Sequence, residues 1–264
     1  MARRQIPGMR AIVTGASSGI GRALAVEWVR QGGRCVVVAR NREKLQLLAD
    51  EIGVPADPKG SLEIVEGDVT LAETRQQAVQ RAVDRWGGLD AVVNNAGIAA
   101  FGRFADGPPQ RLRQIMEVNF FATAEMIRQA LPALREGQYP IVVNVVSILG
   151  HRGIPRMSEY CASKFALQGL SQSLRVELAR EGIDLLVVSP GTTQTEFYEH
   201  VVDGRGEAPW SSGYSVTPAE VARATIKAMR RGRREIFPNV MGHLLVWAHR
   251  LAPRLVDRFL RRYA

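Results

Sequence analysis

Seven short apolar runs, most of them rich in β-branched residues, are separated along the chain by longer stretches of helical periodicity. This alternation restricts the fold more than any other feature, because unbroken apolar runs are typical of strands covered on both faces. The runs are Ala11–Val13, Cys35–Ala39, Leu62–Val65, Ala91–Val93, Ile141–Val146, Leu185–Val188 and, more weakly, Glu235–Phe237. The helical stretches are Ile20–Gln31, Arg42–Ile52, Glu73–Trp86, Arg111–Leu134, Ser158–Arg180 and Pro218–Arg231. Repeated alternation of this kind predicts right-handed crossovers and a parallel sheet.

No polar linker and no internal repeat interrupts the series. We therefore expect residues 1–264 to form one α/β domain, a doubly wound, Rossmann-type parallel sheet of about seven strands with helices on both faces. The longest stretch without periodicity is 192–216. A loop of this length in a compact domain is usually a lid or a binding loop, so we expect it to contact the substrate.

Composition excludes several other classes of protein. Hydrophobic residues make up 46% of the 264 positions, too many for a disordered chain. No apolar run approaches the roughly 20 residues of a membrane-spanning helix, and Met1–Gly8 lacks the pattern of a signal peptide. We expect a cytoplasmic protein.

Cys35 and Cys161 are interpreted as buried reduced thiols. Neither the cysteines nor the histidines have metal-ligand spacing, so we expect no metal site.

The first predicted strand runs directly into the turn T-G-A-S-S-G-I-G, from Thr14 to Gly21, and then into a helix. Glycines at such a turn let backbone N–H groups approach a pyrophosphate at the helix N-terminus. The T-G-x-x-x-G-x-G spacing resembles that of the short-chain dehydrogenase/reductase family, in its shorter single-domain form, and the resemblance extends over roughly Arg10–Phe197. It implies that a nicotinamide dinucleotide contacts Gly15, Ser17, Ser18, Gly19, Ile20 and Gly21.

The residues after the second strand bear on the choice between NAD and NADP. NAD-selective sites of this fold place an acid there, whereas this chain has Arg40, Asn41 and Arg42 and no acid until Glu43. A guanidinium pairs with a ribose 2′-phosphate, and a carboxylate would repel it. We therefore favour NADP(H) over NAD(H), with Arg40 and Asn41 at the adenosine end. Ser18 departs from many NADP-dependent relatives, which have a basic residue at this place in the turn.

Further short motifs match the family and follow predicted strands, at the edge where α/β folds bind ligands. They resemble an adenine-contacting pair after the third strand, an N-N-A-G element after the fourth, and a turn beside the nicotinamide after the sixth. Two threonines follow that turn, and the second matches the family better than the first. The cofactor contacts so implied are Asp68, Val69, Asn95, Ala96, Gly97, Pro190, Gly191, Thr193 and Thr195.

Tyr160 and Lys164 lie four residues apart in a predicted helix, which places both side chains on one face. Free tyrosine has a pKa of ~10, and a neighbouring ammonium group favours the phenolate, so Tyr160 can exchange a proton near neutral pH. Ser147 closes the fifth strand, and its hydroxyl can stabilise charge on a substrate carbonyl. The resemblance implies in addition that Tyr160 and Lys164 contact the nicotinamide ribose and that Asn119 holds a water in the proton relay.

Together these motifs predict an NADP(H)-dependent oxidoreductase that transfers a hydride between nicotinamide and a ketone or secondary alcohol. A dinucleotide-binding sensor or scaffold without turnover is the alternative, because a fold does not prove chemistry. Residues near the predicted site favour an apolar small-molecule substrate. They are Leu149, Gly150, His151, Ile154, Met157, Phe197, Tyr198 and Trp210. By analogy with the family we expect a homodimer or homotetramer built through Arg111–Leu134 and Ser158–Arg180.

Positive charge is concentrated near the C-terminal end. The chain carries +9 overall, and residues 225–264 contain ten basic residues against Glu235 and Asp257, a net +8. Within 240–264, Pro253 is expected to begin a second helix, and arginines accompany an apolar stripe at helical spacing. Such a basic amphipathic segment can pack on a neighbouring subunit, cover the substrate pocket or lie on an anionic membrane. Nucleic-acid binding is disfavoured, because no recognised motif accompanies the charge. The stripe consists of Leu244, Leu245, Ala248, Leu251, Leu255 and Phe259.

Overall fold

A seven-stranded parallel sheet forms the centre of the protein. The computed structural model describes residues 4–53, 60–198, 201–202 and 215–264. Within these ranges the strand order is β3-β2-β1-β4-β5-β6-β7, and every neighbouring pair is parallel. The predicted doubly wound α/β fold is confirmed. The strands are β1 (Arg10–Thr14), β2 (Arg34–Ala39), β3 (Leu62–Glu66), β4 (Ala91–Asn94), β5 (Ile141–Val145), β6 (Asp184–Val188) and β7 (Glu235–Ile236).

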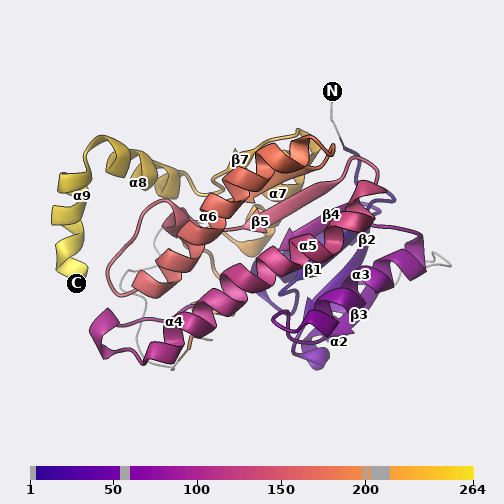
Figure 1. Ribbon diagram of the computed structural model, residues 1–264, viewed down its shortest axis with the longest axis horizontal. Coiled ribbons are helices and arrows are strands. Elements are labelled where there is room, and N and C mark those ends of the chain that lie inside the picture. Colours follow the sequence, from indigo (N-terminus) through magenta and orange to yellow (C-terminus); the bar gives the residue numbers. More distant parts are fainter. Residues whose placement is uncertain (1–3, 54–59, 199–200, 203–214) are drawn as a thin grey trace.

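Helices cover both faces of this sheet (Figure 1). One face is covered by α1 (Gly19–Arg30), α2 (Arg42–Ile52) and α7 (Pro218–Arg230). The other is covered by α3 (Ala72–Trp86), α5 (Ala122–Arg135) and α6 (Ser158–Ala179). Each of these helices lies within two residues of a predicted one, apart from α5, which is the second half of a longer predicted helix. Two further helices, α8 (Val240–Leu251) and α9 (Pro253–Leu260), follow β7.

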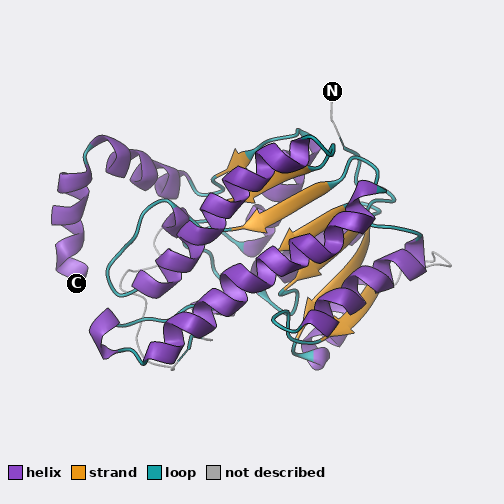
Figure 2. Cartoon of the chain, in the orientation of Figure 1, coloured by secondary structure: helices purple, strands orange, loops and turns teal. Residues whose placement is uncertain are grey.

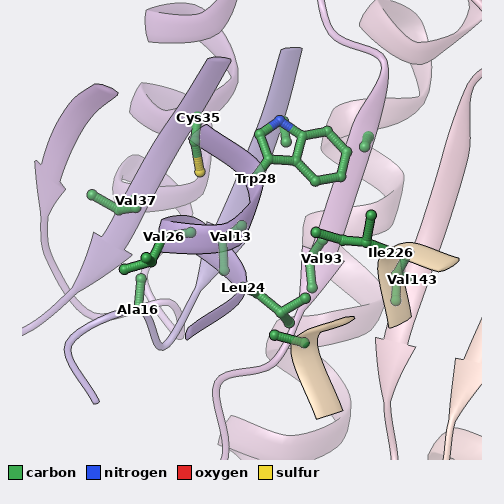
Figure 3. Close-up of a cluster of buried hydrophobic side chains, with 14 of the residues drawn as sticks. Val13, Ala16, Leu24, Val26, Trp28, Cys35, Val37, Val93, Val143 and Ile226 are labelled. Atoms are coloured by element: carbon green, nitrogen blue, oxygen red, sulfur yellow. The ribbon is translucent and has the colours of Figure 1, made fainter. Parts of the chain in front are cut away.

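Alternate residues of each strand bury the two faces of the sheet. In β1, Val13 belongs to the hydrophobic cluster that includes Leu24 and Trp28 of α1 (Figure 3). The preceding residue, Ile12, belongs to the cluster on the opposite face. Because side chains alternate along a strand, covering both faces requires an unbroken apolar run. The indole N–H of Trp28 is satisfied within the core, since it donates to the carbonyl oxygen of Arg34 at 3.1 Å.

One helix differs from its prediction. The periodicity of Arg111–Leu134 predicts a single α-helix, but α4 (Pro109–Met116) is joined to α5 by a π-helical turn at Glu117–Phe121. A π-turn inserts one residue into the helix and rotates the side chains that follow, and apolar spacing alone does not reveal it. The turn contains Asn119, one of the predicted site residues.

The carboxyl ends of the strands meet at one edge of the sheet. Figure 2 shows the arrowheads pointing toward the side of the molecule on which α8 and α9 lie. The order of the strands reverses between β1 and β4, so the connections after these two strands lead away from each other. A reversal of this kind leaves a crevice at the carboxyl edge, where α/β folds bind their ligands.

The C-terminal helices project from the end of the molecule nearest that edge (Figure 1). As predicted, Pro253 begins α9. The predicted apolar stripe does not form one buried face within the chain, because Leu251 and Leu255 are 79% and 67% exposed. The buried apolar residues of these helices, Val246, Val256 and Leu260, lie outside the stripe. The two helices are separated by a break at Ala252.

Candidate functional site

A cavity of about 770 Å³ lies along the carboxyl edge of the sheet, within the size range of small-molecule and cofactor sites. It is lined by the turn after β1, the segments that follow β2 to β6, and parts of α6, α8 and α9. Apart from Gly21, every residue predicted to contact the cofactor lines it. They are Gly15, Ser17, Ser18, Gly19, Ile20, Arg40, Asn41, Asp68, Val69, Asn95, Ala96, Gly97, Tyr160, Lys164, Pro190, Gly191, Thr193 and Thr195.

The turn after β1 has the shape and charge that a diphosphate requires. Gly15 has a left-handed φ of 64°, and a Cβ atom there would lie 2.8 Å from the Cα of Ala96. A Cβ atom on Gly21 would lie 2.3 Å from the carbonyl oxygen of Gly15, so Gly21 lets α1 pack closely against the turn instead of lining the cavity. The first turn of α1 contains no acidic residue, and its N–H groups offer the positive end of the helix dipole to an anion. These residues fit a dinucleotide.

Thr14 and Asn95 hold the turn against the end of β4. The Asn95 amide donates to the carbonyl oxygens of Thr14 and Gly15 at 3.0 and 3.1 Å. In return, Thr14 Oγ1 accepts the backbone N–H groups of Asn95 and Ala96 at 3.0 and 3.1 Å. The N-N-A-G element therefore joins two neighbouring strands directly beside the glycine turn.

The end of the cavity beside β2 and β3 contains the groups predicted at the adenosine. Arg40 and Asn41 line it, and Asn41 Oδ1 also caps α2 by accepting the N–H of Lys44 at 2.8 Å. The Asp68 carboxylate accepts the N–H and the hydroxyl of Thr70 at 2.9 and 2.8 Å, which fixes its orientation. Lys44 lines the cavity as well. The sequence prediction missed Lys44, although its place in the first turn of the helix after Arg40 was an available signal.

The predicted catalytic residues Ser147, Tyr160 and Lys164 line the opposite part of the same cavity. Lys164 Nζ lies 5.7 Å from the centroid of the Tyr160 ring and donates to the carbonyl oxygen of Val145 at 3.0 Å. Burial lowers the pKa of Lys164 to about 8. Ser147 Oγ accepts the backbone N–H of Leu149 at 3.1 Å, which orients the hydroxyl group. The helix spacing of four and the end of β5 thus bring these three side chains together.

Asn119 is fully buried and does not line the cavity. Its side chain bonds both backbone groups of Ile98, accepting the N–H at 2.8 Å and donating to the oxygen at 2.9 Å, and it donates to Ser163 Oγ at 2.9 Å. A Cβ atom on Gly97 would lie 3.2 Å from Asn119 Oδ1 and 3.6 Å from Lys164 Nζ. Asn119 therefore lies behind the cavity wall at Gly97, where Lys164 Nζ is also close.

Apolar side chains line the part of the cavity beyond Ser147. Of the residues suggested for the substrate, Leu149, Ile154, Met157 and Phe197 are among them. The Phe197 ring lies 5.7 Å from the Tyr160 ring, so residues of the 192–216 stretch do reach the site. Trp210 lies outside the described residues. The C-terminal segment adds Leu245, Phe259, Leu260 and Tyr263 to the lining, and of these the predicted stripe contains only Leu245 and Phe259.

Two suggested substrate residues, Gly150 and His151, do not line the cavity. His151 Nε2 lies 3.0 Å from Glu235 Oε1 and 3.1 Å from Ser189 Oγ, so the imidazole is engaged at the sheet edge. The neighbouring residues of the same 3₁₀ turn (Ile148–Gly150), Ile148 and Leu149, do line the cavity.

The two cysteines are buried and unpaired, and burial raises the pKa of both thiols. Among the described residues, no cluster of histidine, cysteine, aspartate and glutamate is suited to hold a metal ion. None of the helices in the described part of the chain is long and apolar enough to cross a membrane.

Comparison with known proteins decides the family. A family model described as short chain dehydrogenase matches residues 9–206. The chain belongs to the short-chain dehydrogenase family. Several relatives match nearly the whole chain. One of them, 11-beta-hydroxysteroid dehydrogenase-like 4A of Arabidopsis thaliana, is 32% identical over 258 residues, and the match covers 96% of this chain and 83% of the relative. Ketoacyl reductase HetN of Nostoc is 30% identical over 263 residues, covering 97% and 89%.

Solved short-chain dehydrogenases share the fold. One from Burkholderia cenocepacia, in complex with NADP, has a TM-score of 0.80 at 27% identity and covers 97% of this chain and 99% of that chain. Another from Burkholderia phymatum, in complex with NAD, has a TM-score of 0.84 at 22% identity and covers 96% of each chain. As a short-chain dehydrogenase, the protein is a nicotinamide-dinucleotide-dependent oxidoreductase.

Proposed function

We propose that the protein interconverts a ketone and a secondary alcohol with NADP(H), and that Tyr160 is its general acid and base. The observation that carries this proposal is the convergence of Ser147, Tyr160 and Lys164 on the cavity that also contains the glycine turn. A nucleotide-binding turn alone would serve a sensor equally well. A phenol, a buried ammonium and an oriented hydroxyl beside it are the groups that proton transfer to a carbonyl oxygen requires.

In the direction of reduction, a bound nicotinamide supplies the hydride. The Ser147 hydroxyl donates to the carbonyl oxygen, and the Tyr160 hydroxyl transfers its proton to that oxygen as negative charge develops. The Lys164 ammonium stabilises the phenolate that remains. The family resemblance implies that Asn119, whose Oδ1 lies near Gly97, helps to hold the water that returns a proton. In oxidation the same groups act in reverse.

The preference for NADP over NAD rests on Arg40. This guanidinium lines the cavity at the end of β2, where NAD-selective sites have a carboxylate. Among the described residues that line the cavity, the cations are Arg40, Lys44 and Lys164, and the carboxylate is Asp68, which is held by Thr70. A 2′-phosphate beside Arg40 and Lys44 therefore meets positive charge.

An apolar substrate is supported by the residues beyond Ser147, which include Leu149, Ile154, Phe197 and Leu245. The names of two relatives, a hydroxysteroid dehydrogenase-like protein and a ketoacyl reductase, favour the same chemical class. Steroids and long-chain keto-lipids are the first substrates to test, because both combine a carbonyl group with a large apolar surface.

Residues 1–264 are proposed to act as one domain of a cytoplasmic homodimer or homotetramer. We also propose that 240–264 lies against an anionic membrane surface. Its outer face exposes Leu244, Trp247, Leu251 and Leu255, and arginines flank them. The acid in this segment, Asp257, is paired with Arg152 at 2.5 Å, so the exposed charge is positive. An apolar face bordered by arginines is the arrangement that binds the interface of an anionic bilayer.

The catalytic proposal is tested with purified protein, NADPH or NADH, and a panel of steroids, keto-lipids and small ketones. We expect carbonyl-dependent oxidation of NADPH, and we expect Tyr160→Phe to lower the rate by about 10²–10⁴-fold while NADPH still binds. Full activity of Tyr160→Phe would show that the mechanism is wrong. Tight NADPH binding without turnover of any carbonyl would favour the sensor or scaffold.

A further inference from the structure

An ion pair joins Lys44, a cation of the cavity lining, to a carboxylate outside the lining. Lys44 Nζ, from the first turn of α2, lies 2.5 Å from Oε2 of Glu196, which belongs to the 3₁₀ helix Glu196–Tyr198. Both side chains are partly exposed, at 38% for Lys44 and 46% for Glu196. Partly exposed pairs of this kind contribute little to stability, so the Lys44 ammonium is available to a stronger anion.

The neighbouring basic residues divide into two groups. Arg40 and Lys44 line the cavity, whereas Arg42, between them, points to Glu66 on β3 at 3.6 Å and is not part of the lining. The N-terminus of α2 adds the positive end of its dipole to the first group. The glycine turn, Gly15–Gly21, contains no basic residue, and Ser17 and Ser18 are the polar side chains that it adds to the lining.

From this arrangement we infer that Lys44 is the second cation of a 2′-phosphate site whose first cation is Arg40. Glu196 holds Lys44 while the phosphate is absent, and Lys44 exchanges this carboxylate for the phosphate when the cofactor binds. The exchange is favourable because a dianionic phosphate forms stronger charge-assisted hydrogen bonds than a solvated carboxylate. The assignment rests on the proposed NADP preference and names the residue that completes it.

The test measures the binding of two fragments by calorimetry: adenosine 2′,5′-bisphosphate, which carries the 2′-phosphate, and adenosine 5′-monophosphate, which lacks it. In Lys44→Gln we expect the bisphosphate to bind about tenfold more weakly, with the monophosphate almost unchanged, because only the bisphosphate reaches the lost ammonium. Arg42→Gln is the matched control, since it removes a neighbouring cation outside the cavity, and both fragments should bind as they do to the unaltered protein. Melting temperatures verify that the variants fold.

Glu196→Gln tests the exchange itself. Without the competing carboxylate, we expect the bisphosphate to bind about two- to fivefold more tightly and the monophosphate to be unaffected. Unchanged or weaker bisphosphate binding would show that Glu196 does not compete with the phosphate for Lys44.

The outcomes separate this inference from the proposed function. Equal binding of the two fragments to the unaltered protein would contradict the NADP preference. If the unaltered protein prefers the bisphosphate and Lys44→Gln keeps that preference, the role of Lys44 is wrong. The NADP preference would then depend on Arg40 alone.

Discussion

The ammonium nitrogen of Lys164 lies 5.7 Å from the centre of the Tyr160 ring, and the Lys164 side chain is buried. Both residues come from one face of α6, and their surroundings come from the ends of other elements: Val145 of β5 accepts a hydrogen bond from Lys164, and Phe197 packs on Tyr160. The low dielectric of this environment strengthens the influence of the ammonium on any charge that develops on the phenol. The same burial makes the charge on Lys164 costly for the fold.

That cost predicts a dependence of stability on pH. Burial lowers the pKa of Lys164 from 10.5 to about 8. Between these values the unfolded chain binds a proton that the folded chain does not, so Lys164 contributes to a free energy of unfolding that rises with pH from about 8 to about 10.5. Chemical unfolding of the protein and of Lys164→Met at several pH values isolates this contribution, because Cys35 and the other titrating groups are common to both. A difference that stays constant over this range would contradict the lowered pKa.

Gly21→Ala is expected to impair cofactor binding. The added Cβ atom would meet the carbonyl oxygen of Gly15 at 2.3 Å, and the turn can accommodate it only by moving. We expect NADPH to bind at least about tenfold more weakly, because the N–H groups that receive the diphosphate are displaced with the turn. Gly169→Ala in α6 is the matched control: its Cβ atom meets nothing within 4 Å, and alanine in a helix should leave NADPH binding unchanged. Fluorescence titration with NADPH compares the two.

Arg40→Asp is expected to reverse the cofactor preference. A carboxylate at the end of β2 repels a 2′-phosphate and accepts a hydrogen bond from a 2′-hydroxyl. The ratio of kcat/KM for NADPH to that for NADH should fall by at least about tenfold. Arg42→Asp makes the same change of charge two residues away, outside the cavity, and should alter the ratio little. If Arg40→Asp retained the original selectivity, the assignment of Arg40 would be wrong.

Asp257→Asn is expected to loosen the C-terminal cover of the substrate end. Arg152 Nη2 lies 2.5 Å from Asp257 Oδ1, and Nη1 lies 3.2 Å from His249 Nδ1, so one guanidinium joins α8 and α9 to the body of the protein. We expect KM for an apolar ketone to rise about two- to tenfold without a change in NADPH affinity, because α9 positions Phe259 and Leu260 in the lining. Asp84→Asn, on α3, removes an exposed charge at a distance from the cavity and should have neither effect. An unchanged KM would mean that the Arg152 contact does not hold the cover.

Vesicle flotation tests the outer face of the same helices. The protein should float with vesicles that contain phosphatidylserine and remain unbound with phosphatidylcholine alone, since each arginine near an anionic surface contributes about 1 kcal/mol. The double substitution Leu251→Ser and Leu255→Ser should abolish flotation, because both side chains are exposed apolar groups of the proposed contact. Val176→Ser, at a site on α6 that is 70% exposed, is the control and should float normally. Loss of binding in the control alone, or no binding by the unaltered protein, would refute the membrane contact.

Several elements and site residues of this protein could be predicted from short stretches of its sequence. The strand β2 could be predicted because both of its faces are covered, which requires the unbroken run Cys35–Ala39. The turn from Gly15 to Gly21 was visible because left-handed or closely packed backbone needs glycine. Tyr160 and Lys164 could be paired from a spacing of four in a helix. Each of these signals depends on neighbours within a few residues along the chain.

Other features depend on contacts between distant segments, and the sequence carried no local sign of them. Asn119 in the π-turn bonds Ile98 and Ser163, which come from other segments. The pairing of Lys44 with Glu196 joins residues 152 positions apart. The C-terminal stripe divides between cavity and surface, because Leu245 and Phe259 line the cavity whereas Leu251 and Leu255 are exposed. Periodicity and spacing therefore determined the strands, helices and turns and the chemistry they carry. Packing in three dimensions decided which of those groups share a cavity, because a contact between remote segments is set by the whole fold.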